Sequence, residues 1–321
     1  MSLSAPPDAV ERELLRAVQG GDDYLFQELV RRHDRLVLST ALRLLRNREE
    51  AEDAAQEVFR RVHHGIASYD RSRPFVPWIY KITLNVCYSH LRRQARRREV
   101  SIEELQPRFD EEGRHVSDEL LVVPDLEERL AARELAQRAE EIIAELPEEY
   151  GTAVWMHDVA GISAATLTEV LRLSLPALKS RLRRGRLAVR KRLLESLADA
   201  KSESSGPAMP GRAPMRRGVT CREVVIHLLD DYLEGRLKAE DRQRFEEHIR
   251  ACDRCGPFVE GYRRVVKGLS RLPEPPIPPE MVQVTLAFVR ESLESGRFLN
   301  RNWAAGLTAA FGRRMRRLLR A

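Results

Sequence analysis

Apolar side chains recur every three to four residues along most of this chain, which is the spacing of one face of an α-helix. Over residues 10–98 this pattern is interrupted at the glycine pair 20–21, at Asn47 and at the polar loop 69–74. Such interruptions mark the places where one helix ends and the next begins. The pattern therefore predicts one domain of several helices over residues 10–98.

Shifts in composition divide the rest of the chain. Residues 99–130 lose the helical period and are rich in acidic side chains, which predicts a flexible acidic linker. The helical period returns over residues 131–198. Residues 199–218 are rich in proline, glycine and serine and predict a second flexible linker. A small helical domain over residues 219–272 and a C-terminal tail with a basic helix over residues 273–321 follow.

The composition favours an all-α fold. Hydrophobic residues make up 43% of the 321 residues, glycine is sparse at 17, and no stretch shows the sustained alternation of β-branched residues that a strand would have. We expect two helical domains joined by a flexible linker, the second of them a helix-turn-helix, and a small third helical domain.

Neither a secretion signal nor a membrane span is predicted. The N-terminal MSLSAPPDAV lacks a basic stretch followed by an apolar one, and no apolar run approaches the ~20 residues of a membrane span. We therefore expect a cytoplasmic protein with no membrane span, whose cysteines stay reduced. The net charge of +6 and the blocks of arginine indicate an anionic partner such as nucleic acid, and a solvated basic surface is the alternative.

Residues 161–192 have the pattern of a helix, a tight turn and a second helix. Ser163 and Ser174 are placed as N-caps, and Pro176 lies in the first turn of the second helix, where proline is tolerated. The second helix is apolar on one side, and its other side carries Lys179, Ser180, Arg181, Arg183 and Arg184. Such a helix suits insertion into the major groove of DNA, and an ordinary basic surface helix is the alternative.

Four residues with metal-binding side chains follow the spacing C-x26-H-x3-C-x2-C, namely Cys221, His248, Cys252 and Cys255. Structural zinc sites have four nitrogen or sulfur ligands in a tetrahedron, so we expect bound Zn²⁺ here. Buried structural cysteines beside a surface histidine are the alternative. Four protein ligands leave no open coordination position, and no nucleotide-binding loop or Ser/His/Asp arrangement stands out, so we expect no enzymatic activity. Cys87 lies apart on an apolar helix face and is expected to be a small core residue.

Three segments resemble a known family. The stretch LPEEYGTAVWMHDVAGIS, followed by LKSRLRRGRLAVRKRL, is similar to the promoter-binding domain of bacterial RNA polymerase sigma factors of the extracytoplasmic-function (ECF) type. Upstream, REEAEDAAQEVFRRV and RPFVPWIYKITLNVCYSHLRR look like the N-terminal domain of that family. The resemblance covers roughly residues 20–197 in the right order. It implies a sigma factor that directs core RNA polymerase to specific promoters and initiates transcription.

The resemblance also implies roles for individual residues. The helix face that binds polymerase matches Asp53, Gln56 and Glu57. The region that binds the melted −10 promoter element matches the loop 69–74 and the residues Lys81, Asn85, Arg92 and Arg93. The helix that enters the groove of the −35 element matches Ala177, Lys179, Ser180, Arg181 and Arg184.

Some features bear on how promoters are bound. Trp78 lies inside an apolar helix pattern, which favours a core position over stacking on a base. The acidic linker matches the segment that threads toward the polymerase active-site channel, and a plain solvated tether is the alternative. Arg172 stands where the family usually has the turn glycine, and a side chain at φ > 0 costs about 1 kcal/mol. The alternative function is accordingly a protein-interaction regulator with weakened promoter binding.

The stretch TCREVVIHLLDDYLEGRLKAEDRQRFEEHIRACDRCGPFVEGYRRVV resembles the zinc-binding domain of anti-sigma factors, and its ligand positions match the four residues of the motif above. His227 is a competing ligand, but we expect it to be partly buried and unligated because it points along a different helix face. Around the ion we expect packing among Leu228, Leu229, Tyr232, Leu233, Phe245 and Ile249. The resemblance implies a fused regulator in intramolecular contact with the sigma domains, and a separate anti-sigma protein is a further candidate partner.

Overall fold

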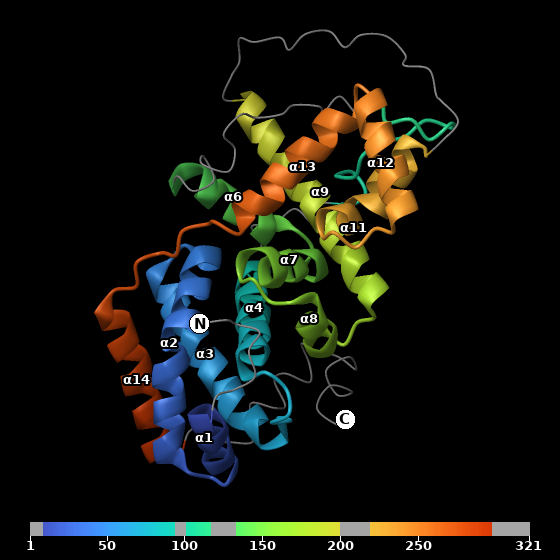
Figure 1. The fold of residues 1–321 in the computed structure, drawn as a ribbon. Helices are drawn as coiled ribbons and strands as arrows, with labels where there is room; N and C mark the ends of the chain where they lie inside the picture. Colours follow the sequence, from blue (N-terminus) through green and yellow to red (C-terminus); the bar gives the residue numbers. More distant parts are fainter. Residues whose placement is uncertain (1–8, 94–100, 117–132, 200–218, 297–321) are drawn as a thin grey trace. The chain divides into compact units, whose positions relative to one another are not determined.

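The computed structural model describes residues 9–93, 101–116, 133–199 and 219–296. This part of the chain is helical apart from loops and one isolated antiparallel bridge between Phe109 and His115, which confirms the all-α prediction (Figure 1). Contacts divide the chain into two compact units, residues 1–97 with 274–321 and residues 98–273. The predicted linker 199–218 and the basic helix after residue 296 lie almost wholly outside the described residues.

The described part of the first unit is a bundle of α-helices. Its loops lie where the sequence predicts them: Asp22 caps the second helix after the glycine pair, and Asn47 caps the third by accepting a hydrogen bond from the Glu50 N–H. Arg46, between the second and third helices, adopts φ 55°. The helices are α1 (Ala9–Gln19), α2 (Asp23–Leu45), α3 (Arg48–Gly65), α4 (Phe75–Arg93) and α14 (Pro279–Glu294), with a short 3-10 turn at Ile66–Ser68.

Helix α14 belongs to this first unit although it follows the zinc-motif segment in sequence. It packs against α2 and α3 (Figure 1). Its buried residues Met281, Thr285, Val289 and Ser292 recur every three or four positions and form one continuous face. Part of the segment predicted as a tail is therefore a component of the N-terminal bundle.

The second unit contains the predicted helix-turn-helix and the zinc-motif segment. The helix-turn-helix part consists of α6 (Arg133–Glu145), α7 (Glu148–Val154), a π-helical turn (Trp155–Val159), α8 (Ala164–Leu171) and α9 (Leu175–Asp199). The zinc-motif part, which we call the zinc domain, consists of α10 (Cys221–Glu223), a π-helical turn (Val224–Leu228), α11 (Leu229–Leu233), α12 (Ala239–Ala251) and α13 (Cys255–Leu269).

Local signals set the turn between α8 and α9. The Ser163 hydroxyl accepts a hydrogen bond from the Thr166 N–H and begins α8. Arg172 ends α8 in the left-handed conformation at φ 54°, as the sequence predicts for the position of the usual turn glycine. Gly185 lets α9 approach α7 closely, because a Cβ there would lie 2.6 Å from Val154 Cγ2. No helix among the described residues is both long and apolar enough to cross a membrane.

Candidate zinc centre and nucleic-acid interface

The structure brings the four residues of the C-x26-H-x3-C-x2-C motif together. Their ligand atoms all lie within 4.8 Å of one another, and the Cys221 and Cys252 sulfurs are 3.8 Å apart. Thr220 and Glu223 form a capping box that begins α10 and places Cys221. His248 lies in the last turn of α12, and Cys255 begins α13.

The donor set fits a tetrahedral zinc ion. Thiolates about 2.3 Å from zinc at tetrahedral angles lie about 3.8 Å apart, which matches the Cys221–Cys252 separation. The Nε2 atom of His248 is buried with no hydrogen-bond partner, as expected for an atom that donates its lone pair to a metal. Hydrogen bonds within the cysteine cluster lower the pKa of the Cys252 thiol and raise that of the Cys255 thiol, so without a metal the cluster favours a thiolate at Cys252.

The other candidate ligands lie elsewhere. His227 is outside the cluster and exposed rather than partly buried, because it falls on the solvent side of the turn before α11. Cys87 is completely buried in the first unit, and burial raises its pKa to about 12, so it is a core residue as predicted.

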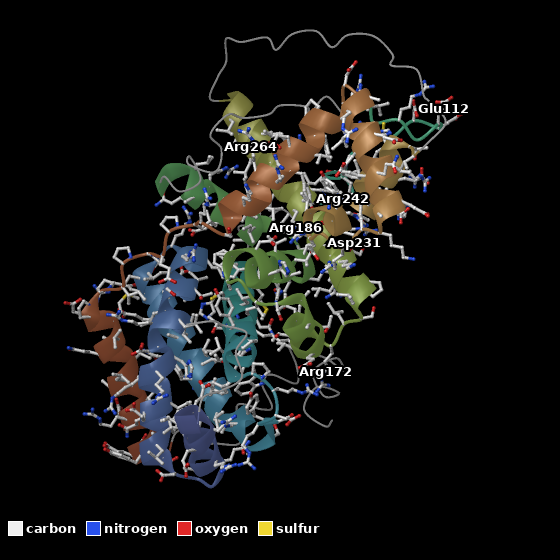
Figure 2. All side chains as sticks on the ribbon, viewed as in Figure 1. Glu112, Arg172, Arg186, Asp231, Arg242 and Arg264 are labelled. Atoms are coloured by element: carbon white, nitrogen blue, oxygen red, sulfur yellow. The ribbon has the colours of Figure 1, made fainter. Side chains whose placement is uncertain are left out.

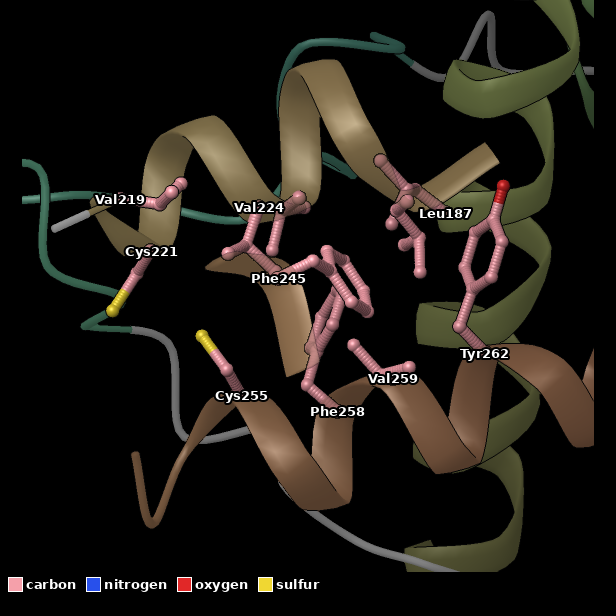
Figure 3. Packing of buried hydrophobic residues seen from close by; sticks show 11 residues of the cluster. Leu187, Val219, Cys221, Val224, Phe245, Cys255, Phe258, Val259 and Tyr262 are labelled. Carbon is pink, nitrogen blue, oxygen red and sulfur yellow. The ribbon is translucent and has the colours of Figure 1, made fainter. Parts of the chain in front are cut away.

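A hydrophobic core lies beside the metal-binding residues, with Cys221 and Cys255 at one end of it (Figure 3). The rings of Tyr232 and Phe245 stack at 4.2 Å, in line with the predicted packing of the aromatic and aliphatic residues around the ion. Phe258 and Tyr262 of α13 are almost completely buried in the same core. Leu187 of α9 is also a member, at 3% exposure, so the helix-turn-helix contributes a side chain to the core of the zinc domain.

The predicted DNA-contacting residues of α9 differ in their surroundings. Lys179 donates from Nζ to Asp231 Oδ1 of the zinc domain at 2.6 Å, and Arg181 pairs with Glu149 of α7 at 3.1 Å. Arg184 is exposed, whereas Ala177 and Ser180 are half-buried. Arg183, on the same helix, donates to the Ile226 carbonyl at 2.6 Å.

A buried charge network that sequence analysis did not find joins α9 to the zinc domain. Arg186, labelled in Figure 2, is 3% exposed. It donates from Nε and Nη2 to both carboxylate oxygens of Asp158, at 2.8 and 2.7 Å. Its Nη1 donates to Asp230 Oδ1 at 3.0 Å, and the Tyr262 hydroxyl donates to the same oxygen at 2.8 Å. No local signal in the sequence distinguishes Arg186 from the neighbouring arginines.

The electrostatics of this network are those of a tightly held ion pair. Burial by itself would raise the pKa of Asp158, but the charge and hydrogen bonds of Arg186 outweigh it and lower the pKa to about 2. Burial likewise opposes the charged form of Arg186, and Asp158 more than compensates, so its pKa lies well above the usual value. Both groups are therefore charged at neutral pH, and the attraction between them compensates for the hydration that each loses on burial.

The predicted sites of the first unit lie on α3 and α4. Asp53 is exposed and Gln56 and Glu57 are half-buried on α3, and Glu57 pairs with Arg60 and Arg61. The predicted −10 residues lie on α4, where Lys81 and Asn85 are half-buried and Arg92 and Arg93 are exposed.

Trp78 belongs to an aromatic cluster of the first unit. Its ring lies 4.9 Å from the ring of Tyr69 and 5.5 Å from that of Phe75. Its indole also lies against Gly65, where a Cβ would be 3.3 Å from the tryptophan ring. Trp78 is therefore packed among aromatic side chains but is half-buried, so it lies at the edge of the core rather than inside it.

Comparison with known protein families identifies the class of the protein. Residues 29–97 match sigma-70 region 2, residues 136–189 match sigma-70 region 4, and residues 221–256 match a zinc-finger family. The first two matches cover the α2–α4 bundle and the helix-turn-helix, and the third covers the four clustered ligands. The chain is thus a sigma factor of bacterial RNA polymerase with a fused zinc-finger domain.

Individual relatives give the family. The chain is 27% identical over 190 residues to RNA polymerase sigma-H factor of Pseudomonas aeruginosa, covering 59% of this chain and 97% of the relative. It is 28% identical over 185 residues to the ECF sigma factor SigW of Bacillus subtilis, covering 57% and 96%. It is 30% identical over 176 residues to the ECF sigma factor SigM of Mycobacterium tuberculosis, covering 55% and 81%. The chain belongs to the ECF family of RNA polymerase sigma factors.

The family and the domains define the function. The protein is a promoter-directing sigma factor, which acts with core RNA polymerase and promoter DNA in transcription initiation, and it carries a zinc-finger domain of the anti-sigma type. Sigma factors are initiation factors rather than enzymes. The alternative of a regulator with weakened promoter binding is not favoured by these findings.

Proposed function

We propose that the zinc domain and α14 form a built-in inhibitor of this sigma factor. In this proposal Cys221, His248, Cys252 and Cys255 hold a structural Zn²⁺ that stabilises the zinc domain. Structural zinc contributes on the order of 10–16 kcal/mol of apparent binding free energy, which is ample for a domain of this size. The inhibitor acts within the cytoplasm and within one chain, so it needs no separate anti-sigma protein.

The contacts of α9 with the zinc domain carry this proposal. The Lys179 ammonium donates a hydrogen bond to the Asp231 carboxylate at 2.6 Å, and Asp231 thus takes the place of a DNA phosphate. Two turns further along the same helix, Arg186 and Leu187 are buried against Asp230 and the zinc-domain core. A helix whose side chains are engaged in this way cannot lie in the major groove of a −35 element at the same time.

The proposal also assigns the promoter contacts and the domain limits. We assign −35 contact to Ala177, Lys179, Ser180, Arg181 and Arg184, and −10 contact to Lys81, Asn85, Arg92 and Arg93 of α4. The domain limits follow the same division, with region 2 over residues 10–98, region 4 over residues 131–198 and the zinc domain over residues 219–272.

Helix α14 supports the second half of the proposal. Asp53, Gln56, Glu57 and Arg60 are spaced at i, i+3, i+4 and i+7 and therefore share one face of α3. The guanidinium of Arg60 lies over the ring of Phe288 in α14, 5.5 Å from its centroid. The predicted polymerase-binding face thus borders a contact with α14, so polymerase and α14 compete for it.

Transcription in vitro tests the proposal. We expect run-off transcription from a cognate promoter, with purified core polymerase, to be stronger for a chain truncated after residue 218 than for the full chain. Equal activity of the two proteins would show that residues 219–321 do not inhibit. Zinc content of the full chain, measured by atomic absorption, should be one ion per chain, and variants of each ligand should lower it.

A further inference from the structure

The segment between the two sigma regions, residues 101–116, packs on the zinc domain and on α9. Its chain reverses at a hairpin closed by the bridge between Phe109 and His115, with Gly113 in the turn at φ +75°. Glu112, labelled in Figure 2, marks the tip of this hairpin. Although acidic in composition, the segment is anchored at several points along its length.

Two aromatic side chains of the segment join the zinc domain. Phe109 packs against its hydrophobic core. His115 is 1% exposed, and its ring lies 4.8 Å from the ring of Phe258. Neither nitrogen of the His115 ring has a hydrogen-bond partner, so the residue is held by packing rather than by polar contacts of its side chain.

Two backbone carbonyls of the segment are held by residues adjacent to metal ligands. The N–H of Arg222, which follows Cys221, donates to the Gly113 carbonyl at 2.9 Å. The Nη1 of Arg254, which precedes Cys255, donates to the His115 carbonyl at 3.1 Å. The position of the Arg222 N–H is therefore set by the start of α10, and that of the Arg254 side chain by the turn between Cys252 and Cys255.

Helix α9 holds the other end of the segment. Gln106 donates from Nε2 to the Arg184 carbonyl at 3.2 Å, and Lys191 donates from Nζ to the Glu104 carbonyl at 3.0 Å. Ile102 and Leu105 are buried, at 4% and 6% exposure. The segment thus spans from the recognition helix to the ligand turn.

We propose that metal binding and docking of residues 101–116 are coupled, so that loss of the metal releases the segment that joins the two sigma regions. The reason is geometric: the metal fixes the backbone around Cys221 and the Cys252–Cys255 turn, and these are the places that present the two donors. Coupling is reciprocal, so docking of the segment also raises the affinity for the metal. This inference rests on the zinc site of the proposed function but not on inhibition of transcription, because it concerns a different surface of the zinc domain from the one that contacts Lys179.

Hydrogen exchange on the full chain tests one direction of the coupling. Amides of the hairpin are protected by its own hydrogen bonds, including Val116 N–H to the Arg108 carbonyl at 2.9 Å. We expect a zinc chelator to speed exchange across residues 104–116 by at least about ten-fold, while peptides from α2 and α3 stay unchanged. Unchanged exchange in residues 104–116, with faster exchange in α12 and α13, would overturn the proposal.

A glycine substitution in the segment tests the other direction and leaves the sequence of the zinc domain unchanged. Gly113→Ala places a Cβ at φ +75° and 3.4 Å from Thr220, so it disfavours the docked hairpin. We expect it to weaken zinc affinity in chelator competition by about five-fold, the factor that the φ > 0 strain of one non-glycine residue gives. Phe109→Ala, which removes the aromatic anchor, should weaken zinc affinity in the same direction.

The matched control is Gly235→Ala in the zinc domain. Gly235 has φ +68°, and a Cβ there would meet nothing within 4 Å, so it introduces similar strain with no contact to the segment. If Gly113→Ala and Phe109→Ala bind zinc as tightly as the wild type, docking and metal binding are independent and the proposal fails. Because no polymerase or DNA is present, this result is separable from failure of the proposed inhibition.

Discussion

Replacement of Asp230 by alanine is the sharpest test of how the zinc domain is held on α9. Asp230 Oδ1 accepts hydrogen bonds from Arg186 Nη1 at 3.0 Å and from the Tyr262 hydroxyl at 2.8 Å. Arg186 and Tyr262 are 3% and 0% exposed, so neither donor can turn to water while the interface is closed. Asp230→Ala leaves both donors without this acceptor.

The expected cost follows from these contacts. Removing one partner of a buried charge pair costs about 3–5 kcal/mol, and the lower end applies because Arg186 keeps its two bonds to Asp158. A loss of about 3 kcal/mol lowers the ratio of closed to open molecules roughly a hundred-fold. If α9 binds DNA only when the interface is open, apparent DNA affinity rises by up to that factor, until the open form predominates.

Fluorescence anisotropy with a labelled promoter duplex, with core polymerase at a fixed concentration, measures the effect. Asp231→Ala is the matched control, because its ion pair with Lys179 is partly exposed and worth at most about 1 kcal/mol. We expect Asp230→Ala to increase promoter affinity far more than Asp231→Ala, with circular dichroism and zinc content unchanged. The reasoning is refuted if Asp230→Ala binds promoter DNA no more tightly than the wild type while the truncated chain binds more tightly.

Three further predictions concern other contacts. Phe288→Ala removes the ring beneath Arg60, a kind of contact that contributes about 0.5–1 kcal/mol. We therefore expect Phe288→Ala to bind core polymerase a few-fold more tightly in a pull-down titration. Arg290→Ala, on the exposed side of α14, should leave polymerase binding unchanged. Gly185→Ala forces a Cβ to within 2.6 Å of Val154 and should lower the free energy of unfolding of the second unit by about 1–3 kcal/mol in urea titration, whereas a wild-type midpoint would contradict the close packing. The pKa of Asp158 falls from 3.8 to about 2 on folding, so ionised Asp158 contributes about 2 kcal/mol to stability above pH 4. This contribution is lost as the pH falls toward 2. If Asp158→Asn leaves the acid-unfolding curve unchanged, Asp158 does not make this contribution.

Much of the fold could be predicted because its signals are local. The glycine pair at 20–21, Asn47 and Ser163 mark helix boundaries by their own backbone and capping preferences. Three of the four metal-binding residues fall within eight positions of one another, so spacing alone indicates a common site. Composition is a weaker guide for residues 101–116, which it predicts to be part of a flexible acidic linker, because it does not indicate that Ile102 and Leu105 are buried.

The two adjacent aspartates of the sequence LDDYL explain why the interface could not be predicted. Successive residues of a helix point about 100° apart, so Asp230 faces Arg186 and Tyr262 while Asp231 lies at the edge beside Lys179. In sequence both are acidic residues on a short amphipathic helix, and an ion pair at the exposed edge contributes little. Burial makes the difference, and burial at Asp230 depends on Arg186, 44 positions earlier, and on Tyr262, 32 positions later. Such an interaction is a property of the packed helices and becomes visible only when α9, α11 and α13 are assembled.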